Sequence, residues 1–126
     1  MARHTPEPLL EASGTSGMKA ALNGVPSLSV PDGWWAEGFR GDNGWSIGGT
    51  DAASDPETQD REDAAALYAA LEGDVIPRFF ERDAEGVPHR WIETMKASIE
   101  SVVPHFSAHR MVRDYVERFY VPTAGI

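Results

Sequence analysis

One short segment near the N-terminus carries the residues best suited to chemistry. Glycine and hydroxyl residues fill positions 13–17, a helix-favouring run covers positions 18–22, and Asn23-Gly24 provides a stop signal. This order predicts a loop that opens into a short helix, with Ser13 or Thr15 capping the first turn and a left-handed cap at Asn23-Gly24. Exposed amides and the helix dipole favour phosphate or carboxylate at such an N-terminus. Because Lys19 follows about one turn later, the segment predicts an anion site beside an amine.

The same segment lacks two familiar nucleotide-binding patterns. Its loop glycines stand at positions 14 and 17, which fits neither the G-x-x-x-x-G-K-S/T loop nor the G-x-G-x-x-G fingerprint. From the residues alone, a tight strand-to-helix connection with a solvated lysine is the alternative interpretation.

The next elements have short strand and turn signals. Ser27-Leu28-Ser29-Val30 alternates polar and apolar residues between two prolines and predicts a short strand. The stretch from Gly44 to Gly48 predicts a second strand. Trp34 and Trp35 stand between turn formers, and we interpret them as core or interface residues rather than as platforms for sugar rings.

Positions 49–60 are rich in Asp, Ser, Thr and Pro and predict a polar surface loop. Asp51, Asp55 and Asp60 are of the right type for calcium, but their spacing lacks the glycine and terminal glutamate of an EF-hand. His105 and His109 are four residues apart and have no obvious third ligand. We therefore predict a solvated loop and no metal site.

Three apolar stripes predict helices in the second half of the chain. The first ends or kinks at Pro77 and consists of Ala64, Leu67, Tyr68, Leu71 and Val75. The second begins near Pro88 and consists of Trp91, Ile92, Met95, Ile99 and Val102. The third follows Ser107 as cap and consists of Met111, Val112, Tyr115, Val116 and Phe119. So small a sheet cannot bury all three stripes, and we expect the isolated chain to be sticky or marginally stable.

Composition limits the classes of function. The formal net charge of −9 argues against general electrostatic binding to nucleic acid or to an anionic membrane. The chain contains no cysteine, so it has neither a disulfide framework nor a thiolate metal site. No apolar run approaches the length of a membrane span, and a cytoplasmic location is expected.

The segment Glu11-Ala-Ser-Gly-Thr-Ser-Gly-Met-Lys19 closely resembles the pyridoxal-phosphate attachment segment of the α-glucan phosphorylases, the family of glycogen, starch and maltodextrin phosphorylases. Asp32-Gly33-Trp34-Trp35-Ala36-Glu37-Gly38 resembles its continuation in the bacterial short-type members. Arg110-Met111-Val112 and Tyr120-Val121-Pro122 resemble the C-terminal end of the family. The resemblance runs from about Leu9 to the end of the chain.

This resemblance implies roles for individual residues. Lys19 matches the lysine that binds the cofactor covalently; the only other lysine is Lys96, in a tail helix. The positions that hold the cofactor phosphate match Thr15, Ser16 and Gly17. The positions that contact the glucosyl unit match Glu11, Ser13 and Gly14. Ser16-Gly17 departs from the Gly-Asn or Ser-Asn pair of the animal, plant and enteric enzymes.

The implied reaction is phosphorolysis of an α-1,4-glucan by inorganic phosphate, releasing glucose 1-phosphate. The implied fold is the α/β GT-B type, of which this chain is expected to be the C-terminal part of the second Rossmann-like domain, followed by about three helices. Residues 1–10 are then an extended lead-in, 11–60 the partial Rossmann-like portion and 61–126 the helical portion. The expected partners are the missing N-terminal domains and, in a possible homo-oligomer, further copies.

Two other functions are weighed against this one. Retaining GT-B enzymes that use sugar nucleotides commonly have two glutamates eight positions apart, and the second of these positions is Lys19 here. That replacement favours the phosphorylases. The second alternative is a truncated, non-catalytic module whose exposed helices only bind a partner.

Overall fold

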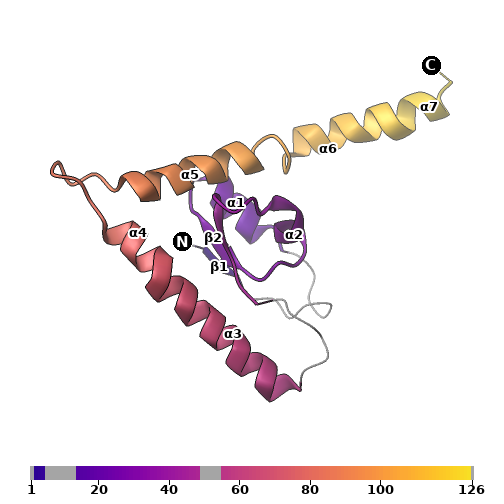
Figure 1. Ribbon diagram of the computed structural model, residues 1–126. Helices are drawn as coiled ribbons and strands as arrows, with labels where there is room; N and C mark the ends of the chain where they lie inside the picture. The colour runs from indigo at the N-terminus through magenta and orange to yellow at the C-terminus, as the bar shows by residue number, and fades with distance from the viewer. Residues whose placement is uncertain (1, 5–13, 49–54, 126) are drawn as a thin grey trace.

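The computed structural model describes residues 2–4, 14–48 and 55–125 (Figure 1). Three short parallel strands form a sheet in the order β1-β2-β3, with bounds Ala2–His4, Ser27–Ser29 and Gly44–Ser46. Leu28 of β2 pairs with Arg3 on one side and with Trp45 on the other. Both strands predicted between positions 27 and 48 are confirmed. β2 is the central strand, and all three of its residues are buried.

Two helices connect the strands. Helix α1 (Ser16–Leu22) lies between β1 and β2 in the chain, and α2 (Trp34–Gly38) lies between β2 and β3. Parallel strands require such crossover connections, because the chain must return to the edge where the first strand began. The sheet and its helices confirm the α/β class.

A long helical rod runs along one side of the sheet (Figure 1). It comprises α3 (Pro56–Ala70), the π-helical turn η1 (Leu71–Val75) and α4 (Ile76–Phe80). The Asp55 carboxylate caps its N-terminus by accepting from the amides of Glu57 and Thr58, both at 3.1 Å. The predicted polar loop is therefore wrong over positions 56–60, where Asp55 followed by proline starts a helix. Positions 49–54 of that loop lie outside the described residues.

Of the two outcomes expected at Pro77, an end or a kink, the rod does not end there. The helix continues to Phe80, and the distortion lies in the turn before the proline, where the Ile76 amide donates to the Leu71 carbonyl. Proline has no N–H and crowds the preceding turn, and the wider π turn accommodates this loss. The same arrangement recurs before Pro122, where the Val121 amide donates to the Val116 carbonyl.

Two clusters of buried side chains form the core. The first core cluster consists of Ala21, Trp34, Trp35 and Val102, with Met18 and Phe106 packed against it. The second core cluster consists of Leu28, Val30 and Ile47, covered by Trp45 and by Ala66, Leu67, Ala70 and Leu71. Tyr68 is 61% exposed and Ala64 is exposed too, so these two positions of the predicted stripe are wrong. The rod touches the sheet along a narrow line through positions 66, 67, 70 and 71, which leaves its flanks in solvent.

Helix α5 (His89–Val102) crosses the sheet region and packs against α1 (Figure 1). Trp91 and Val102 of its predicted stripe are buried, whereas Ile99 is 38% exposed. The buried face also contains three small hydroxyl residues that hydrophobicity did not reveal, namely Thr94, Ser98 and Ser101. Small side chains let a helix approach its neighbours closely. The Thr94 hydroxyl donates to the Arg90 carbonyl and the Ser101 hydroxyl to the Ser98 carbonyl, both at 3.1 Å, whereas the Ser98 hydroxyl has no hydrogen-bond partner among the described residues.

The last helical segment comprises α6 (Ala108–Tyr115), η2 (Val116–Tyr120) and α7 (Val121–Thr123), and it extends away from the other elements (Figure 1). Ser107 caps it as predicted, because its hydroxyl accepts from the Arg110 amide at 3.2 Å. Its predicted apolar stripe is left uncovered: Met111, Val112, Tyr115, Val116 and Phe119 are 39–57% exposed. We call these five residues the C-terminal apolar face.

Within the described ranges, no helix combines the length and the apolar character that crossing a membrane requires.

Candidate functional site

Helix α1 presents the residues that the sequence marks for chemistry. The helix begins directly after Thr15, and the amide of Lys19, one turn later, donates to the Thr15 carbonyl at 3.0 Å. The Thr15 hydroxyl makes no capping bond, so this expected cap is wrong. A capping residue needs an extended backbone, whereas Thr15 has helical angles (φ −83°, ψ −7°). Ser13, the other expected cap, lies outside the described residues.

The C-terminal end of α1 has the predicted left-handed cap. Gly24 has φ +73°, and its amide donates to the Ala21 carbonyl while the Val25 amide donates to the Ala20 carbonyl, both at 3.0 Å. This pair of bonds is the Schellman motif. A Cβ atom at position 24 would lie 3.2 Å from Ile99 Cδ1, so the cap also brings the end of α1 against α5.

The accessible part of the segment is its beginning. The side chains of Thr15, Ser16 and Lys19 are exposed, and no carboxylate in the described part of the chain pairs with the Lys19 amine. Among the described residues, no atom lies within 4 Å of a Cβ atom added at Gly14. The first three amides of a helix have no acceptor within it, which leaves those of positions 16–18 to bind a ligand. Open space, free amides and an uncommitted amine fit a phosphate-bearing aldehyde.

Five of the seven predicted site residues lie together on this turn. They are Gly14, Thr15, Ser16, Gly17 and Lys19. Glu11 and Ser13, for which contact with a glucosyl unit is expected, lie outside the described residues.

Gly17 is the buried member of the segment, and Trp34 covers it. A Cβ atom at position 17 would lie 2.9 Å from Trp34 Cζ2 and 3.0 Å from Nε1. Trp34 is the first residue of α2 and follows β2 closely in the chain. The contact therefore brings the first turn of α1 to the carboxyl end of β2, the edge of a parallel sheet at which α/β proteins bind their ligands.

The neighbouring residues Trp34 and Trp35 lie in the core, in agreement with the interpretation from the sequence. Trp34 is 8% exposed and Trp35 is 1% exposed. The Trp35 indole N–H donates to the Trp45 carbonyl at 3.2 Å, which joins α2 to β3. Neither ring offers a face on which a sugar could stack.

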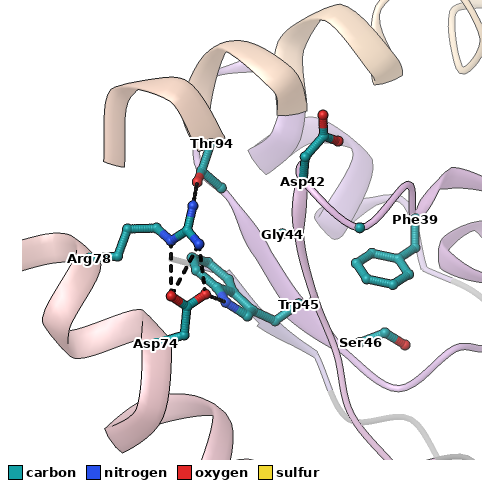
Figure 2. A pocket seen from close by; sticks show the side chains of 9 residues that line it. Phe39, Asp42, Gly44, Trp45, Ser46, Asp74, Arg78 and Thr94 are labelled. Carbon is teal, nitrogen blue, oxygen red and sulfur yellow. Dashed lines mark hydrogen bonds and ion pairs between the residues drawn. The ribbon is translucent and has the colours of Figure 1, made fainter. Parts of the chain in front are cut away.

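A second polar cluster, which the sequence analysis did not single out, surrounds Asp74 (Figure 2). The Asp74 carboxylate accepts from the Trp45 indole N–H at 2.8 Å, from Arg78 at 3.0 Å and from Arg90 at 3.3 Å. Arg78 also donates to the Thr94 hydroxyl at 3.2 Å. These bonds tie β3, the π turn, α4 and α5 together. Only the Asp74–Arg78 spacing of four residues is visible in the sequence as a helical ion pair.

The electrostatics of this cluster favour a charged Asp74. Partial burial opposes ionisation, but the hydrogen bonds from Trp45 and Arg78 and the positive charges of Arg78 and Arg90 outweigh it, so the pKa of Asp74 lies below its ordinary value of 3.8. The cluster forms one wall of an open pocket of about 150 Å³, and Phe39 and Ser46 lie across from it (Figure 2). Because Asp74 already accepts bonds from three side chains, we assign it a structural role.

Asn43 is the other important residue that the sequence analysis missed. It is fully buried, and its amide donates to the Gly38 carbonyl at 2.7 Å and to the Ser101 hydroxyl at 2.8 Å. Its carbonyl oxygen accepts from the Arg40 amide at 2.9 Å. The turn signal around position 43 predicts a loop but not its attachment to a helix 58 residues away.

No group of three or more histidine, cysteine or acidic side chains suited to a metal ion occurs in residues 2–4, 14–48 and 55–125. Asp51, one of the residues weighed for calcium, is outside these ranges. Asp55 caps α3, and hydrogen bonding from Thr58 holds the pKa of its carboxyl below the ordinary value.

Fold and site together define a class of protein segment. It is a parallel α/β unit whose first crossover helix follows a turn rich in serine and glycine and carries an exposed lysine.

Comparison with known proteins narrows this class. The chain is 50% identical over 117 residues to glycogen phosphorylase of Aquifex aeolicus, and 50% identical over 115 residues to glycogen phosphorylase of Mycobacterium tuberculosis. It is 55% identical over 119 residues to maltodextrin phosphorylase of Thermococcus litoralis. These alignments cover 91–93% of this chain. No protein-family model matches the chain, and no solved structure matches it significantly.

The chain is therefore homologous to a segment of the glycogen and maltodextrin phosphorylases, which confirms the resemblance seen in the sequence. It spans 13–16% of the length of these relatives. The relatives are enzymes of carbohydrate metabolism of the glycosyltransferase type, and they favour a phosphorylase over the sugar-nucleotide alternative.

Proposed function

We propose that this chain supplies the cofactor-attachment segment of an α-glucan phosphorylase. Its identity of 50–55% to glycogen and maltodextrin phosphorylases over nearly its whole length is the observation that carries this proposal. In the proposed enzyme, Lys19 binds pyridoxal 5′-phosphate covalently. The exposed amine of Lys19, one helical turn after the glycine- and serine-rich loop, supports that role.

The remaining site residues divide into two groups. We assign Thr15, Ser16 and Gly17 to the cofactor phosphate, because exposed hydroxyl groups and unpaired amides meet at the start of α1. Glu11, Ser13 and Gly14 are assigned to the glucosyl unit of the substrate. The absence of any other described atom within 4 Å of a Cβ atom at Gly14 supports this assignment.

In the proposed enzyme, this chain attaches the cofactor covalently and orients it. The Lys19 amine must lose its proton before it can bond to an aldehyde, and exclusion of water favours the neutral amine. In the isolated chain this side chain is exposed, so the rest of the enzyme must close over it. When bound, the cofactor supplies a phosphate group that exchanges a proton with inorganic phosphate during phosphorolysis of an α-1,4-glucan to glucose 1-phosphate.

The proposed setting is a GT-B enzyme in which this chain completes the second Rossmann-like domain. The small parallel sheet and its crossover helices are of the right class for such a domain. The C-terminal apolar face is 39–57% exposed along its whole length, and we propose that it docks on parts of the phosphorylase that this chain does not span.

Covalent trapping tests the attachment site. The chain is mixed with pyridoxal phosphate, reduced with borohydride and mapped by peptide mass spectrometry. Labelling concentrated on Lys19 is the expected result, and Lys19→Ala should abolish it. Lys96 is the internal reference, since it is the other lysine of the chain and is also exposed. Equal labelling of the two lysines would show that the chain holds no shaped site.

A segment exchange tests the activity. The aligned segment of the Aquifex aeolicus glycogen phosphorylase is replaced by this chain, and phosphate-dependent release of glucose 1-phosphate from glucan is measured. Activity that is lost with Lys19→Ala and kept with Lys96→Ala is expected. An active Lys19→Ala chimera would overturn the proposal, and activity with a sugar nucleotide in place of phosphate would restore the glycosyltransferase alternative. A chimera that folds but catalyses neither reaction would agree with a non-catalytic module.

A further inference from the structure

The contact between α1 and α2 is made by a glycine on one side and a tryptophan on the other. Gly17 lies in the first turn of α1, two residues before Lys19. A Cβ atom there would lie 2.9 Å from Trp34 Cζ2, 3.0 Å from Nε1 and 3.2 Å from Cε2. Real Cβ atoms do not approach carbon this closely, because the overlap is strongly repulsive at such distances. The surface of α1 therefore rests directly on the edge of the indole ring.

The indole ring cannot move away to relieve such an overlap. On its other side, a Cβ atom at Gly38 would lie 3.1 Å from Trp34 Cε3 and Cζ3. The ring also contacts Trp35, with centroids 5.1 Å apart, and Phe106 edge-to-face at 5.5 Å. Trp34 is only 8% exposed. It is thus a rigid spacer that fixes the distance between α1 and the body of the domain.

The position of this spacer matters for Lys19. Helix α1 has seven residues, and Lys19 lies two residues after Gly17, so displacement of its first turn displaces Lys19. The Schellman cap and Ile99 hold the far end of the helix, and the Gly17–Trp34 contact holds the near end together with Met18, which packs against the first core cluster. A change of about 1 Å in the placement of a reacting group can cost about two orders of magnitude in rate.

We propose that Trp34 is a positioning residue for Lys19, and that glycine is required at position 17 because the first turn of α1 must lie directly against the edge of this indole ring. The proposal rests on the proposed function, since it concerns the lysine that binds the cofactor. It also gives a physical reason for the departure at Ser16-Gly17 from the residue pairs of other phosphorylases: any side chain at position 17 would overlap Trp34.

The test is site-selective labelling of the full chain. Pyridoxal phosphate and borohydride are applied to the wild type, Gly17→Ala, Trp34→Phe and the double variant, and the ratio of modified Lys19 to modified Lys96 is measured. Circular dichroism at the same temperature confirms that each sample is folded, so the ratio reports placement rather than stability. Gly73→Ala is the matched control, because a Cβ atom there would meet nothing within 4 Å.

We expect Gly17→Ala to lower the labelling ratio by about tenfold. Trp34→Phe, which withdraws the indole atoms nearest position 17, should restore the ratio in the double variant to near that of the wild type. Trp34→Phe alone should lower the ratio by a smaller factor, since it loosens the first turn without pushing it. Gly73→Ala should leave the ratio unchanged.

The outcomes distinguish failure of the positioning role from failure of the proposed function. A wild-type chain that labels both lysines equally holds no shaped attachment site, and this overturns the positioning role. A wild type that prefers Lys19, together with a Gly17→Ala variant of unchanged ratio, overturns the positioning role and leaves the proposed function standing. A double variant that stays as low as Gly17→Ala shows that the Trp34 contact is not the cause and also overturns the positioning role. If Gly17→Ala is unfolded, the decision falls to Trp34→Phe, whose ratio must then lie below that of the wild type.

Discussion

Removing the Asn43 side chain tests how the loop before β3 is held. The side chain is fully buried and takes part in three hydrogen bonds of 2.7–2.9 Å, with Gly38, Arg40 and Ser101. Each such bond contributes about 1 kcal/mol net, and a buried group left without its partner costs more. We therefore expect Asn43→Ala to lower the free energy of unfolding by about 3 kcal/mol. That is a large share of the roughly 5–15 kcal/mol typical of a folded domain.

A double-mutant cycle isolates the bond that spans the fold. Asn43→Ala, Ser101→Ala and the double variant are compared by urea unfolding, followed by tryptophan fluorescence. The Ser101 hydroxyl also donates to the Ser98 carbonyl at 3.1 Å, so the coupling energy between positions 43 and 101 should be about 1 kcal/mol rather than the full effect. Asp42→Ala is the control, because this neighbouring side chain is exposed and its loss should change stability by less than about 0.5 kcal/mol.

The reasoning fails if Asn43→Ala costs no more than Asp42→Ala, or if the cycle shows no coupling. The first result would mean that the three bonds of this buried side chain add no stability. The second would mean that the bond between Asn43 and Ser101 adds none.

Two further predictions concern acid stability and association. Because the folded state lowers the pKa of Asp74 below 3.8, its contribution to stability is present above that value and is lost as the pH falls through the lower folded value. Asp74→Asn should be less stable than the wild type at neutral pH, and the difference should shrink below about pH 4 in thermal melts; parallel curves would refute this. Replacing Tyr115 and Phe119 of the C-terminal apolar face by lysine should reduce self-association in analytical ultracentrifugation, whereas Glu117→Lys, which removes no apolar surface, should not. A wild-type chain that is a monodisperse monomer with a sharp cooperative unfolding transition would contradict the expectation of a sticky or marginally stable chain.

Features decided by neighbouring residues were predictable from the sequence. The strands around Leu28 and Trp45, the left-handed cap at Gly24 and the hydroxyl cap at Ser107 depend on local backbone preferences. The homology to phosphorylases could also be recognised from the sequence, because the segment from Glu11 to Lys19 is contiguous and highly specific. At Pro77 the local signals left a helix end or a kink open; the helix continues past the proline, and a π turn before it accommodates the ring.

Features that join distant parts of the chain were decided only by the tertiary structure. Periodicity shows that a helix has an apolar side, but not which line along it meets the sheet, so Tyr68 and Ile99 were misjudged and Ser98 and Ser101 were missed. A buried polar residue such as Asn43 has no sequence signature, because its partners come from a helix 58 residues away. The role of Gly17 likewise follows from the indole ring that folding brings against it. Type and spacing predict which residues are suited to chemistry, and packing decides how they are held.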